Sequence, residues 1–385
     1  MIPTLSTSNF LLIYLAGLDA LLGFTSAAPV IPESQAISTS STKRADAEVI
    51  PLKEVGDGSA YTVNMVIDGI LLPIHIDTGS SQLWVAHSSC KTCADAQMTS
   101  IDAEVSDNCA GQEKIEYAAG SVSGCLVNTS ISLGDHTLDN YSVLAATEVS
   151  EEIATNGDLY SGTLGLADDS LTNSGGPTLI SQLYQQGQLG SPEVGFYLPG
   201  KEQNGTEGEM ALGNPTSSNH IGTSEPVVLP RAVKEDGVYT VNLDEVKIDA
   251  DSIAAEQVAV LDTGSIGIGI PSKVSQDIFK QIYGEVRDED GGKKVACTPG
   301  DNNTTSTLTF TFGGKPFGIP YADLVSDPEN DGECWALIGA YEGVSSAWSV
   351  DDSDEKWVLG DAFLHNLYHT VNVQTGEVKL FAIKE

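Results

Sequence analysis

The chain has 385 residues, of which 41% are hydrophobic, so it is long enough for two domains with separate apolar cores. Its 39 Gly and 16 Pro favour short strands and turns over long helices. With 54 Asp and Glu against 18 Lys and Arg, the formal net charge of -36 at pH 7 excludes nucleic acids and anionic membranes as partners. Acidic pH removes much of this self-repulsion. The composition therefore suits a protein that works in acid, and an acidic surface kept for solubility is the alternative.

Residues 1–27 are predicted to be a signal peptide. The stretch from Phe10 to Phe24 is largely apolar, and the small residues that follow it fit cleavage after Ala27. No later stretch of the sequence is apolar over the length needed to span a bilayer. We therefore expect a secreted, extracellular protein with no membrane partner.

Residues 28–44 have the composition of a short pro-segment. They are rich in Ser, Thr, Pro and Ala, and they end in the dibasic pair Lys43–Arg44. A dibasic pair after a flexible polar segment is what processing proteases of the secretory pathway recognise. We expect such a protease to cut after Arg44, and an accidental pair in a linker is the alternative.

The cysteines favour an oxidising compartment, because six of them allow up to three disulfides. The spacing of Cys90 and Cys93 also occurs in zinc sites and redox pairs. Because the sequence has a secretory leader and lacks a Cys/His pair at the spacing of a zinc finger, we expect disulfides and no metal. The pairing among Cys90, Cys93, Cys109 and Cys125 stays open between three possibilities.

Glycosylation signals agree with passage through a secretory pathway. Each candidate is an Asn-x-Ser/Thr sequence, which also arises by chance. The candidates are Asn128, Asn140, Asn204, Asn302 and Asn303.

Apolar and β-branched residues recur in short runs between turn residues, which is typical of strands. Helical patterns are few. The sequence therefore predicts a mostly β protein. The expected strands are 61–67, 69–76, 127–133, 239–243 and 307–312, and the expected helices are 178–186 and 272–284.

An internal repeat divides the chain. Residues 74–80, Ile-His-Ile-Asp-Thr-Gly-Ser, recur as residues 259–265, Ala-Val-Leu-Asp-Thr-Gly-Ser. An apolar segment containing Gly follows each copy, at residues 163–166 and 358–361. Because the same order appears twice, the chain is predicted to be a duplicated unit.

The repeat places a carboxylate on a tight turn after each strand. If the halves face each other, Gly79 and Gly264 let Asp77 and Asp262 approach closely, because no Cβ intervenes. Two such carboxyls share one proton in acid, so one activates a water while the other donates to a peptide carbonyl. The expected supporting residues hydrogen-bond the carboxyls or tie the turns together, and they are Ser80, Ser265, Thr78 and Thr263.

From about Tyr61 onward these motifs resemble the pepsin-like aspartic proteases. The resemblance implies a bilobal fold of two duplicated β-lobes with the active-site cleft between them. The lobes would be residues 45–225, with a flap, and residues 226–385. It also implies protein or peptide substrates, pepstatin-like inhibitors, no cofactor and a monomer.

The resemblance assigns further residues. Tyr117 would be the tyrosine of the flap, with its hydroxyl bonded to Trp84. The flap turn is Ala118, Ala119 and Gly120, where Gly and a polar residue are usual in the family. The family's disulfide in the second lobe corresponds to Cys297 and Cys334.

One group of residues is expected to contact substrate. By the resemblance, His75, Tyr160 and Thr163 line the pocket for the residue before the scissile bond. These polar groups suggest a pocket less selective for large apolar side chains. In acid, a protonated His75 would disfavour Lys or Arg there.

Two other classes of protein were weighed. A catalytically inactive relative that binds or inhibits proteins usually loses an active-site Asp or its Gly, and both copies are intact here. A glycan-binding β protein would expose aromatic platforms, and aromatic residues make up only 6% of this chain.

Overall fold

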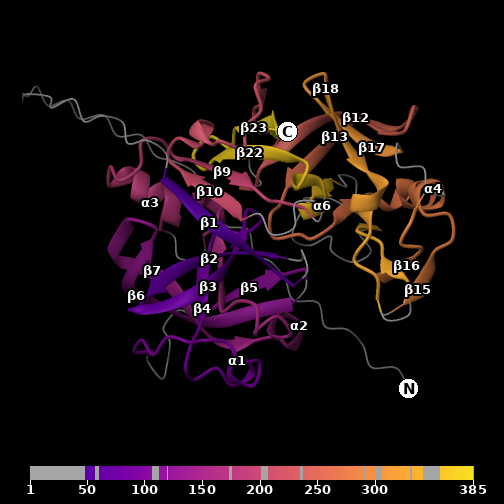
Figure 1. Cartoon of the computed structure of the whole chain (residues 1–385). Helices are drawn as coiled ribbons and strands as arrows, with labels where there is room; N and C mark the ends of the chain where they lie inside the picture. The colour runs from indigo at the N-terminus through magenta and orange to yellow at the C-terminus, as the bar shows by residue number, and fades with distance from the viewer. Residues whose placement is uncertain are drawn as a thin grey trace, which may run out of the picture. The chain divides into compact units, whose positions relative to one another are not determined.

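The computed structural model describes residues 48–56, 60–105, 112–118, 120–172, 176–200, 207–234, 237–289, 292–299, 306–329, 332–340 and 356–384. They belong to one compact unit, Lys43–Glu385 (Figure 1). The expected signal peptide and pro-segment lie outside the described residues, as do Asn204, Asn302 and Asn303. None of the described helices combines the length and apolarity that a membrane crossing needs.

The described residues form mostly strands, so the mostly β prediction is confirmed. The first half contains β1 (Glu48–Val55), β2 (Ala60–Ile67), β3 (Ile70–Asp77), β4 (Leu83–Ala86), α1 (Lys91–Asp95), β5 (Gln112–Tyr117), β6 (Gly120–Leu133), β7 (His136–Val149), α2 (Glu151–Ala154), β8 (Gly162–Gly165), α3 (Leu179–Gln185), β9 (Glu193–Tyr197) and β10 (Gly208–Leu212).

The second half contains β11 (Val227–Leu229), β12 (Thr240–Ile248), β13 (Asp251–Leu261), β14 (Ile268–Ile270), α4 (Ser272–Ile282), β15 (Arg287–Glu289), β16 (Gly292–Val295), β17 (Thr307–Phe312), β18 (Lys315–Pro320), β19 (Cys334–Trp335), β20 (Ile338–Ala340), β21 (Trp357–Leu359), α6 (Asp361–Leu364), β22 (Leu367–Asn372) and β23 (Val378–Ala382). Short 3-10 turns lie at Asp169–Leu171, Pro215–Ser217 and Tyr321–Leu324.

Alternating burial explains why these segments are strands. In β2, Val63, Met65 and Ile67 are buried, while Asn64 and Val66 between them are exposed. In β17, buried Leu and Phe residues alternate with half-buried Thr. Since successive side chains of a strand point to opposite faces, each of these segments turns its apolar set toward the core.

The described strands form three sheets. The largest has thirteen strands in the order β11-β23-β22-β9-β10-β1-β2-β3-β8-β4-β7-β6-β5. A seven-stranded sheet has the order β18-β17-β12-β13-β21-β14-β20, and β15, β16 and β19 form a small third sheet.

Strand pairing repeats in the two halves, which confirms the predicted duplication. β3 pairs in parallel with β8, and β4 pairs antiparallel with β8. In the same way β13 pairs in parallel with β21, and β14 pairs antiparallel with β21. Each repeat therefore builds the same local frame around the turn that carries its aspartate.

The C-terminal strands join strands from the first half of the chain. β22 pairs with β9, and β23 pairs with β22 and β11. In Figure 1 the yellow β22 lies beside β9 and β10. The expected division at residue 225 stays a prediction, because this sheet contains strands from both sides of it.

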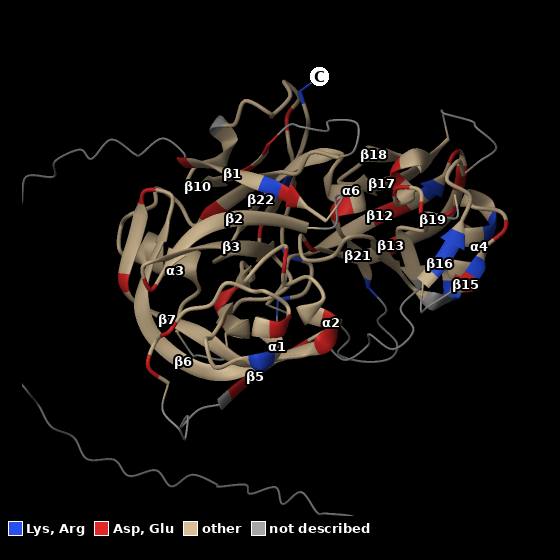
Figure 2. Ribbon diagram, turned by 60° about the horizontal axis from the view of Figure 1, so that its bottom comes forward, with Lys and Arg blue, Asp and Glu red and all other residues tan. Residues whose placement is uncertain are grey.

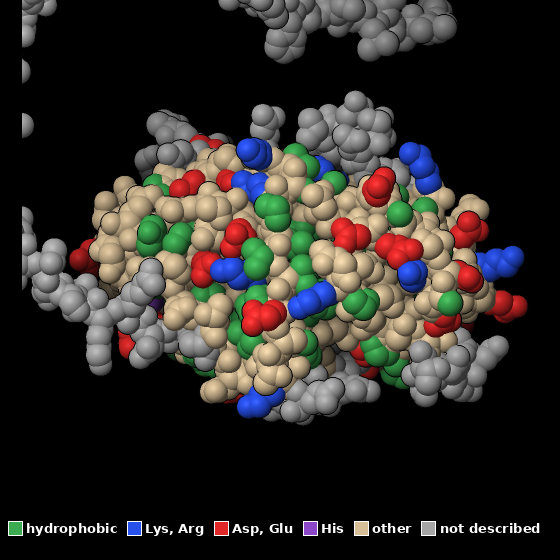
Figure 3. All heavy atoms as spheres, turned by 90° about the horizontal axis from the view of Figure 1, so that it is seen from above, with side chains coloured by type: hydrophobic (Ala, Val, Ile, Leu, Met, Phe, Trp, Pro, Cys, Tyr) green, Lys and Arg blue, Asp and Glu red, His purple; other side chains and the backbone are tan. Residues whose placement is uncertain are grey.

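Charged side chains lie mainly outside the core. Figure 2 shows Asp and Glu spread along the chain, whereas several Lys and Arg gather on α4, β15 and β16. Arg287 and Lys293 there form ion pairs with Glu333 and Asp288. On the face shown in Figure 3, charged side chains and small apolar patches are interspersed.

Candidate active site

Asp77 and Asp262 occupy equivalent turns. Asp77 ends β3 and Asp262 follows β13, and their side chains are among the few buried carboxylates, with 6% and 4% of each residue exposed. The backbone N–H of Gly79 donates to Oδ1 of Asp77 at 2.8 Å, and that of Gly264 donates to Oδ1 of Asp262 at 2.9 Å. Each turn therefore fixes the inner oxygen of its own carboxyl.

Two serines hold the outer oxygens. Ser80 Oγ donates to Oδ2 of Asp77 at 2.5 Å, and Ser265 Oγ donates to Oδ2 of Asp262 at 2.6 Å. The two carboxyls thus have matching partners on both oxygens.

Glycine is required where the turns meet. A Cβ on Gly79 would lie 2.6 Å from Oδ1 of Asp262, and one on Gly264 would lie 2.4 Å from Oδ1 of Asp77. Either contact is shorter than real Cβ atoms make, so each carboxyl packs directly against the glycine of the opposite turn. The structure brings the two predicted aspartates together in this way.

The threonines tie the turns to each other. The backbone N–H of Thr78 donates to Thr263 Oγ1 at 3.1 Å, and the N–H of Thr263 donates to Thr78 Oγ1 at 3.0 Å. The hydroxyls then donate across to the carbonyls of Leu261 and Ile76. These four buried hydrogen bonds fix the relative position of the carboxyls.

Burial raises the pKa of both carboxyls. Burial raises the pKa of Asp262 to about 7, with a further contribution from the charge of Asp77. Burial also raises the pKa of Asp77, against hydrogen bonds from Ser80 and Gly79 that stabilise its charged form. The pair therefore keeps a proton through the acid range.

A third carboxyl, missed by the sequence analysis, lies close to Asp262. Asp361 begins α6 and is 1% exposed, and neither of its carboxyl oxygens has a hydrogen-bond partner among the described residues. Its backbone N–H donates to Ser265 O at 2.8 Å. Burial raises its pKa well above the ordinary range, as do the charges of Asp262 and Glu54. The Gly-Asp pair was visible in the repeat, but nothing in the sequence indicated a buried, unpaired acid.

The expected flap residues lie at a hairpin. Tyr117 ends β5 and pairs with Gly120 at the start of β6. Trp84 Nε1 donates to the hydroxyl of Tyr117 at 3.0 Å, which is the contact that the resemblance implied. Ala118 is exposed, and Ala119 lies outside the described residues.

His75 lies on the same strand face as Asp77 and stacks on Tyr160. The ring centroids are 5.0 Å apart at an interplanar angle of 25°. Burial lowers the pKa of His75 to about 4, although the charge of Asp262 acts in the opposite direction. Burial thus confines protonation of His75 to the lower part of the acid range, so the expected exclusion of Lys and Arg applies there and stays a prediction.

Two disulfides are defined by the described residues. Cys90 pairs with Cys93 across the start of α1, and Cys297 pairs with Cys334. Cys125 is also disulfide-bonded, and Cys109 lies outside the described residues. Cys90 and Cys93 pack in the same apolar cluster as Trp84, with Tyr117 against it.

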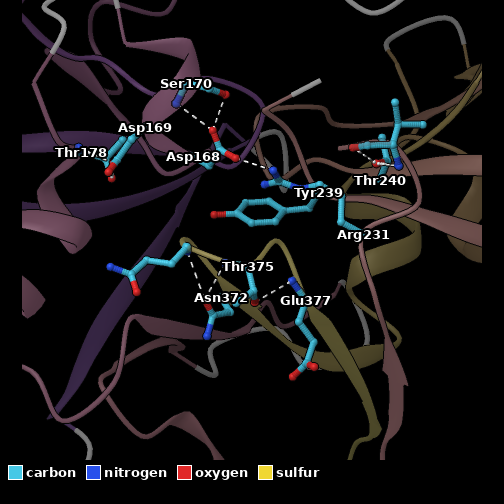
Figure 4. A network of polar contacts seen from close by, with 12 residues as sticks. Asp168, Asp169, Ser170, Thr178, Arg231, Tyr239, Thr240, Asn372, Thr375 and Glu377 are labelled. Carbon is cyan, nitrogen blue, oxygen red and sulfur yellow. Dashed lines mark hydrogen bonds and ion pairs between the residues drawn. The ribbon is translucent and has the colours of Figure 1, made fainter. Parts of the chain in front are cut away.

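A polar network away from Asp77 and Asp262 links the two halves of the chain (Figure 4). Asp168, shortly after β8, forms a partly buried ion pair with Arg231, and its backbone N–H donates to Gly237 O at 2.9 Å. The hydroxyl of Tyr239 donates to Leu166 O. The segment after β8 is therefore fixed to the second half, like the turn that carries Asp77.

The described residues contain no group of three or more His, Cys, Asp or Glu side chains arranged to hold a metal ion. The chemistry available at this site is that of paired carboxyls and their hydrogen bonds. Such a pair can take a proton from one group and give a proton to another.

Comparison with known proteins agrees with this geometry. The profile of the family described as eukaryotic aspartyl protease matches residues 71–383. The chain is 32% identical to Rhizopuspepsin-4 of Rhizopus niveus over 343 residues, covering 87% of this chain and 80% of the relative. It is 30% identical to Rhizopuspepsin-3 of the same organism over 355 residues, covering 90% and 84%. It is 26% identical to the probable vacuolar protease A of Trichophyton verrucosum over 313 residues, covering 80% and 74%. The chain therefore belongs to the eukaryotic aspartyl protease family.

Proposed function

We propose that the protein is an aspartic endopeptidase that hydrolyses peptide bonds in acid, with Asp77 and Asp262 as its catalytic residues. The observation that carries the proposal is the contact of the two buried carboxyls across Gly79 and Gly264. Both retain a raised pKa in spite of hydrogen bonds that favour their charged forms. Membership of the family supports the same activity.

The two carboxyls would take different roles. Burial raises the pKa of Asp262 to about 7, and the charge of Asp77 adds to that rise, so we assign the proton to Asp262 and the negative charge to Asp77. Asp77 removes a proton from a water molecule while the oxygen of that water attacks the carbon of the peptide carbonyl. Asp262 protonates the carbonyl oxygen. Asp77 then gives its proton to the amide nitrogen as the C–N bond breaks, and a hydroxyl of the tetrahedral intermediate returns a proton to Asp262, which releases an acid and an amine and restores both carboxyls. Such sharing of one proton is the known behaviour of aspartic-protease dyads.

The decisive experiment is digestion of a denatured protein at pH 4 to 5 by the purified, processed enzyme, with and without pepstatin. We expect pepstatin-sensitive hydrolysis, and loss of at least about a thousandfold in Asp77→Asn and Asp262→Asn. Both variants should remain folded. Activity within tenfold of wild type in either variant, free of host protease, contradicts the proposal.

We further propose secretion and processing after Arg44 by a second protease. Support comes from the apolar leader, the dibasic pair and the disulfides. Asn128 and Asn140 are exposed on β6 and β7, as glycan acceptors need to be. N-terminal sequencing of secreted Asp77→Asn protein tests the processing step. A start at Ala45 in this variant supports cleavage by another protease, whereas an uncut pro-segment indicates self-processing.

A further inference from the structure

The end of the β5–β6 hairpin, where Tyr117 pairs with Gly120, lies next to the first aspartate. The hydroxyl of Tyr117 accepts from Trp84 and interacts with Ser80. The hydroxyl of Ser80 in turn donates to Asp77. Burial raises the pKa of Tyr117, and the charge of Asp77 adds to this rise. The position of the hairpin end therefore decides where the phenol lies relative to the dyad.

Ser150 completes the strand pairing that supports the hairpin end. β6 pairs with β7 up to Val122 and Val149, which are both buried. One residue further along, the backbone N–H of Ser150 donates to Ser121 O at 2.9 Å. The return bond goes to a side chain, since the N–H of Ser121 donates to Ser150 Oγ at 3.2 Å. The last link between β6 and the segment after β7 therefore depends on one hydroxyl.

This hydroxyl is diverted from the role that its position suggests. Ser150 is the N-cap of α2, and an N-cap serine usually accepts from the N–H two or three residues later. Among the described residues, the side chain of Ser150 makes no such bond. Hydrogen bonds from its own backbone N–H and from the Ser150 hydroxyl hold the pKa of Glu152 below its usual range. Ser150 Oγ thus accepts from the hairpin and donates to a carboxylate of α2.

Glycine at position 120 allows this close approach. Gly120 has a φ of 135°, and a Cβ there would lie 2.1 Å from Ser150 Oγ and 3.4 Å from Oε2 of Glu152. The first contact is shorter than real Cβ atoms make, so a side chain at this position would displace the hydroxyl. Gly120 and Ser150 therefore form one arrangement, which holds the strand that leaves the hairpin end.

We propose that Ser150 is a positioning residue, whose hydroxyl holds the hairpin end so that the phenol of Tyr117 stays beside Asp77. The inference rests on the proposed peptide hydrolysis. Because Ser150 acts through Tyr117, the loss of its hydroxyl should reduce activity only while the phenol hydroxyl is present. One hydrogen bond of ordinary strength corresponds to about a tenfold change in kcat/KM.

The test is a double-mutant cycle in the processed enzyme at pH 4 to 5, with kcat and KM measured on one peptide. The variants are Ser150→Ala, Ser150→Thr, Tyr117→Phe and the combination of Ser150→Ala with Tyr117→Phe. Ser150→Ala keeps the backbone bond to Ser121 and loses only the hydroxyl, which Ser150→Thr retains. Ser132→Ala, at the other end of β6, is the matched control, because the Ser132 hydroxyl also bonds a side chain, that of Thr137, at 3.0 Å.

We expect kcat/KM to fall about tenfold in Ser150→Ala. Ser150→Thr and Ser132→Ala should both behave like wild type. In the Tyr117→Phe background, Ser150→Ala should cost little more, because the group that it positions is gone. Additive losses in the combined variant overturn the proposal, as does a normal kcat/KM in Ser150→Ala.

Backbone amide hydrogen exchange measures the same contact without catalysis. Peptides that span residues 120–123 should exchange faster in Ser150→Ala than in wild type, and at the wild-type rate in Ser132→Ala. Equal exchange in Ser150→Ala and wild type also overturns the proposal. If folded wild type cleaves no peptide, the proposed hydrolysis itself fails, and the exchange data distinguish that outcome from failure of the hairpin contact.

Discussion

Thr78 and Thr263 exchange hydrogen bonds across the two repeats, each hydroxyl accepting from the backbone N–H of the other residue at 3.0 to 3.1 Å. The exchange is symmetric because the two turns have the same sequence. Each turn therefore holds the other in position, which keeps the two facing carboxyls at a fixed separation.

Replacing one of these threonines by valine should therefore reduce both stability and activity. Thr263→Val leaves the buried N–H of Thr78 without its partner, at a cost of about 1 to 3 kcal/mol. We also expect kcat to fall, because the carboxyls lose their fixed separation. Urea unfolding and steady-state kinetics measure the two effects. Thr311→Val, at a half-buried strand position, is the matched control and should change neither.

The close packing of glycine against carboxylate gives a sharper prediction. In Gly264→Ala the added Cβ meets Oδ1 of Asp77 at 2.4 Å, so one of the turns has to shift. A displacement approaching 1 Å at the reacting groups costs about a hundredfold in rate. Gly339→Ala is the control, because its Cβ has no atom within 4 Å. Equal kcat/KM for the two variants would show that the contact of the turns is not needed for catalysis.

The hydrogen bond from Trp84 to Tyr117 is predicted to position the flap. Tyr117→Phe retains the ring but leaves the buried indole N–H without its acceptor. We expect kcat/KM to fall about tenfold, which corresponds to one ordinary hydrogen bond. Tyr184→Phe, on α3, should behave like wild type. A normal kcat/KM in Tyr117→Phe means that ring packing alone holds the hairpin.

Stability is predicted to fall as pH rises from about 6.5 through the folded pKa of Asp262, about 7, and through the raised pKa of Asp361. The pKa values of Asp262 and Asp361 are raised in the folded protein, so the folded state binds more protons than the unfolded chain. This contribution is complete below the unfolded pKa near 4 and is lost as pH rises through the folded values. Each such proton changes the free energy of unfolding by about 1.4 kcal/mol per pH unit.

Two histidines oppose this trend at lower pH. Burial lowers the pKa of His75 to about 4 and that of His369 to about 3, so protonation favours the unfolded chain below about pH 6.5. Above that pH the carboxyls act unopposed. Thermal melts from pH 3 to 8 measure the curve, and Asp361→Asn should flatten its neutral side. A melting temperature that rises from pH 6.5 to 8 contradicts the assignment.

The sequence predicted the site better than its surroundings. Asp77, Thr78 and their counterparts were inferable because the turn chemistry is local and occurs twice. The strand at 307–312 was also found at its true limits, since its Thr and apolar residues alternate strictly. β6, expected at 127–133, begins at Gly120, because Ser and Gly residues conceal the alternation.

What the sequence missed depends on distant partners. Nothing local shows that Asp361 bonds the Asp262 turn through its backbone while its carboxyl has no hydrogen-bond partner among the described residues. The low pKa of His75 arises from burial, which a strand pattern does not quantify. Likewise the partner of Cys90 was open, because spacing alone allows several pairings.

The pairing of β22 with β9 has a consequence for synthesis of the chain. While the ribosome is still adding the second half, β9 has β10 beside it but its other edge lacks the partner that comes later. An open strand edge with buried residues such as Val194 and Phe196 invites pairing with other nascent chains. The thirteen-stranded sheet is complete only after residues 367–382 have been synthesised. The sheet of the first half therefore depends on the last strands of the chain.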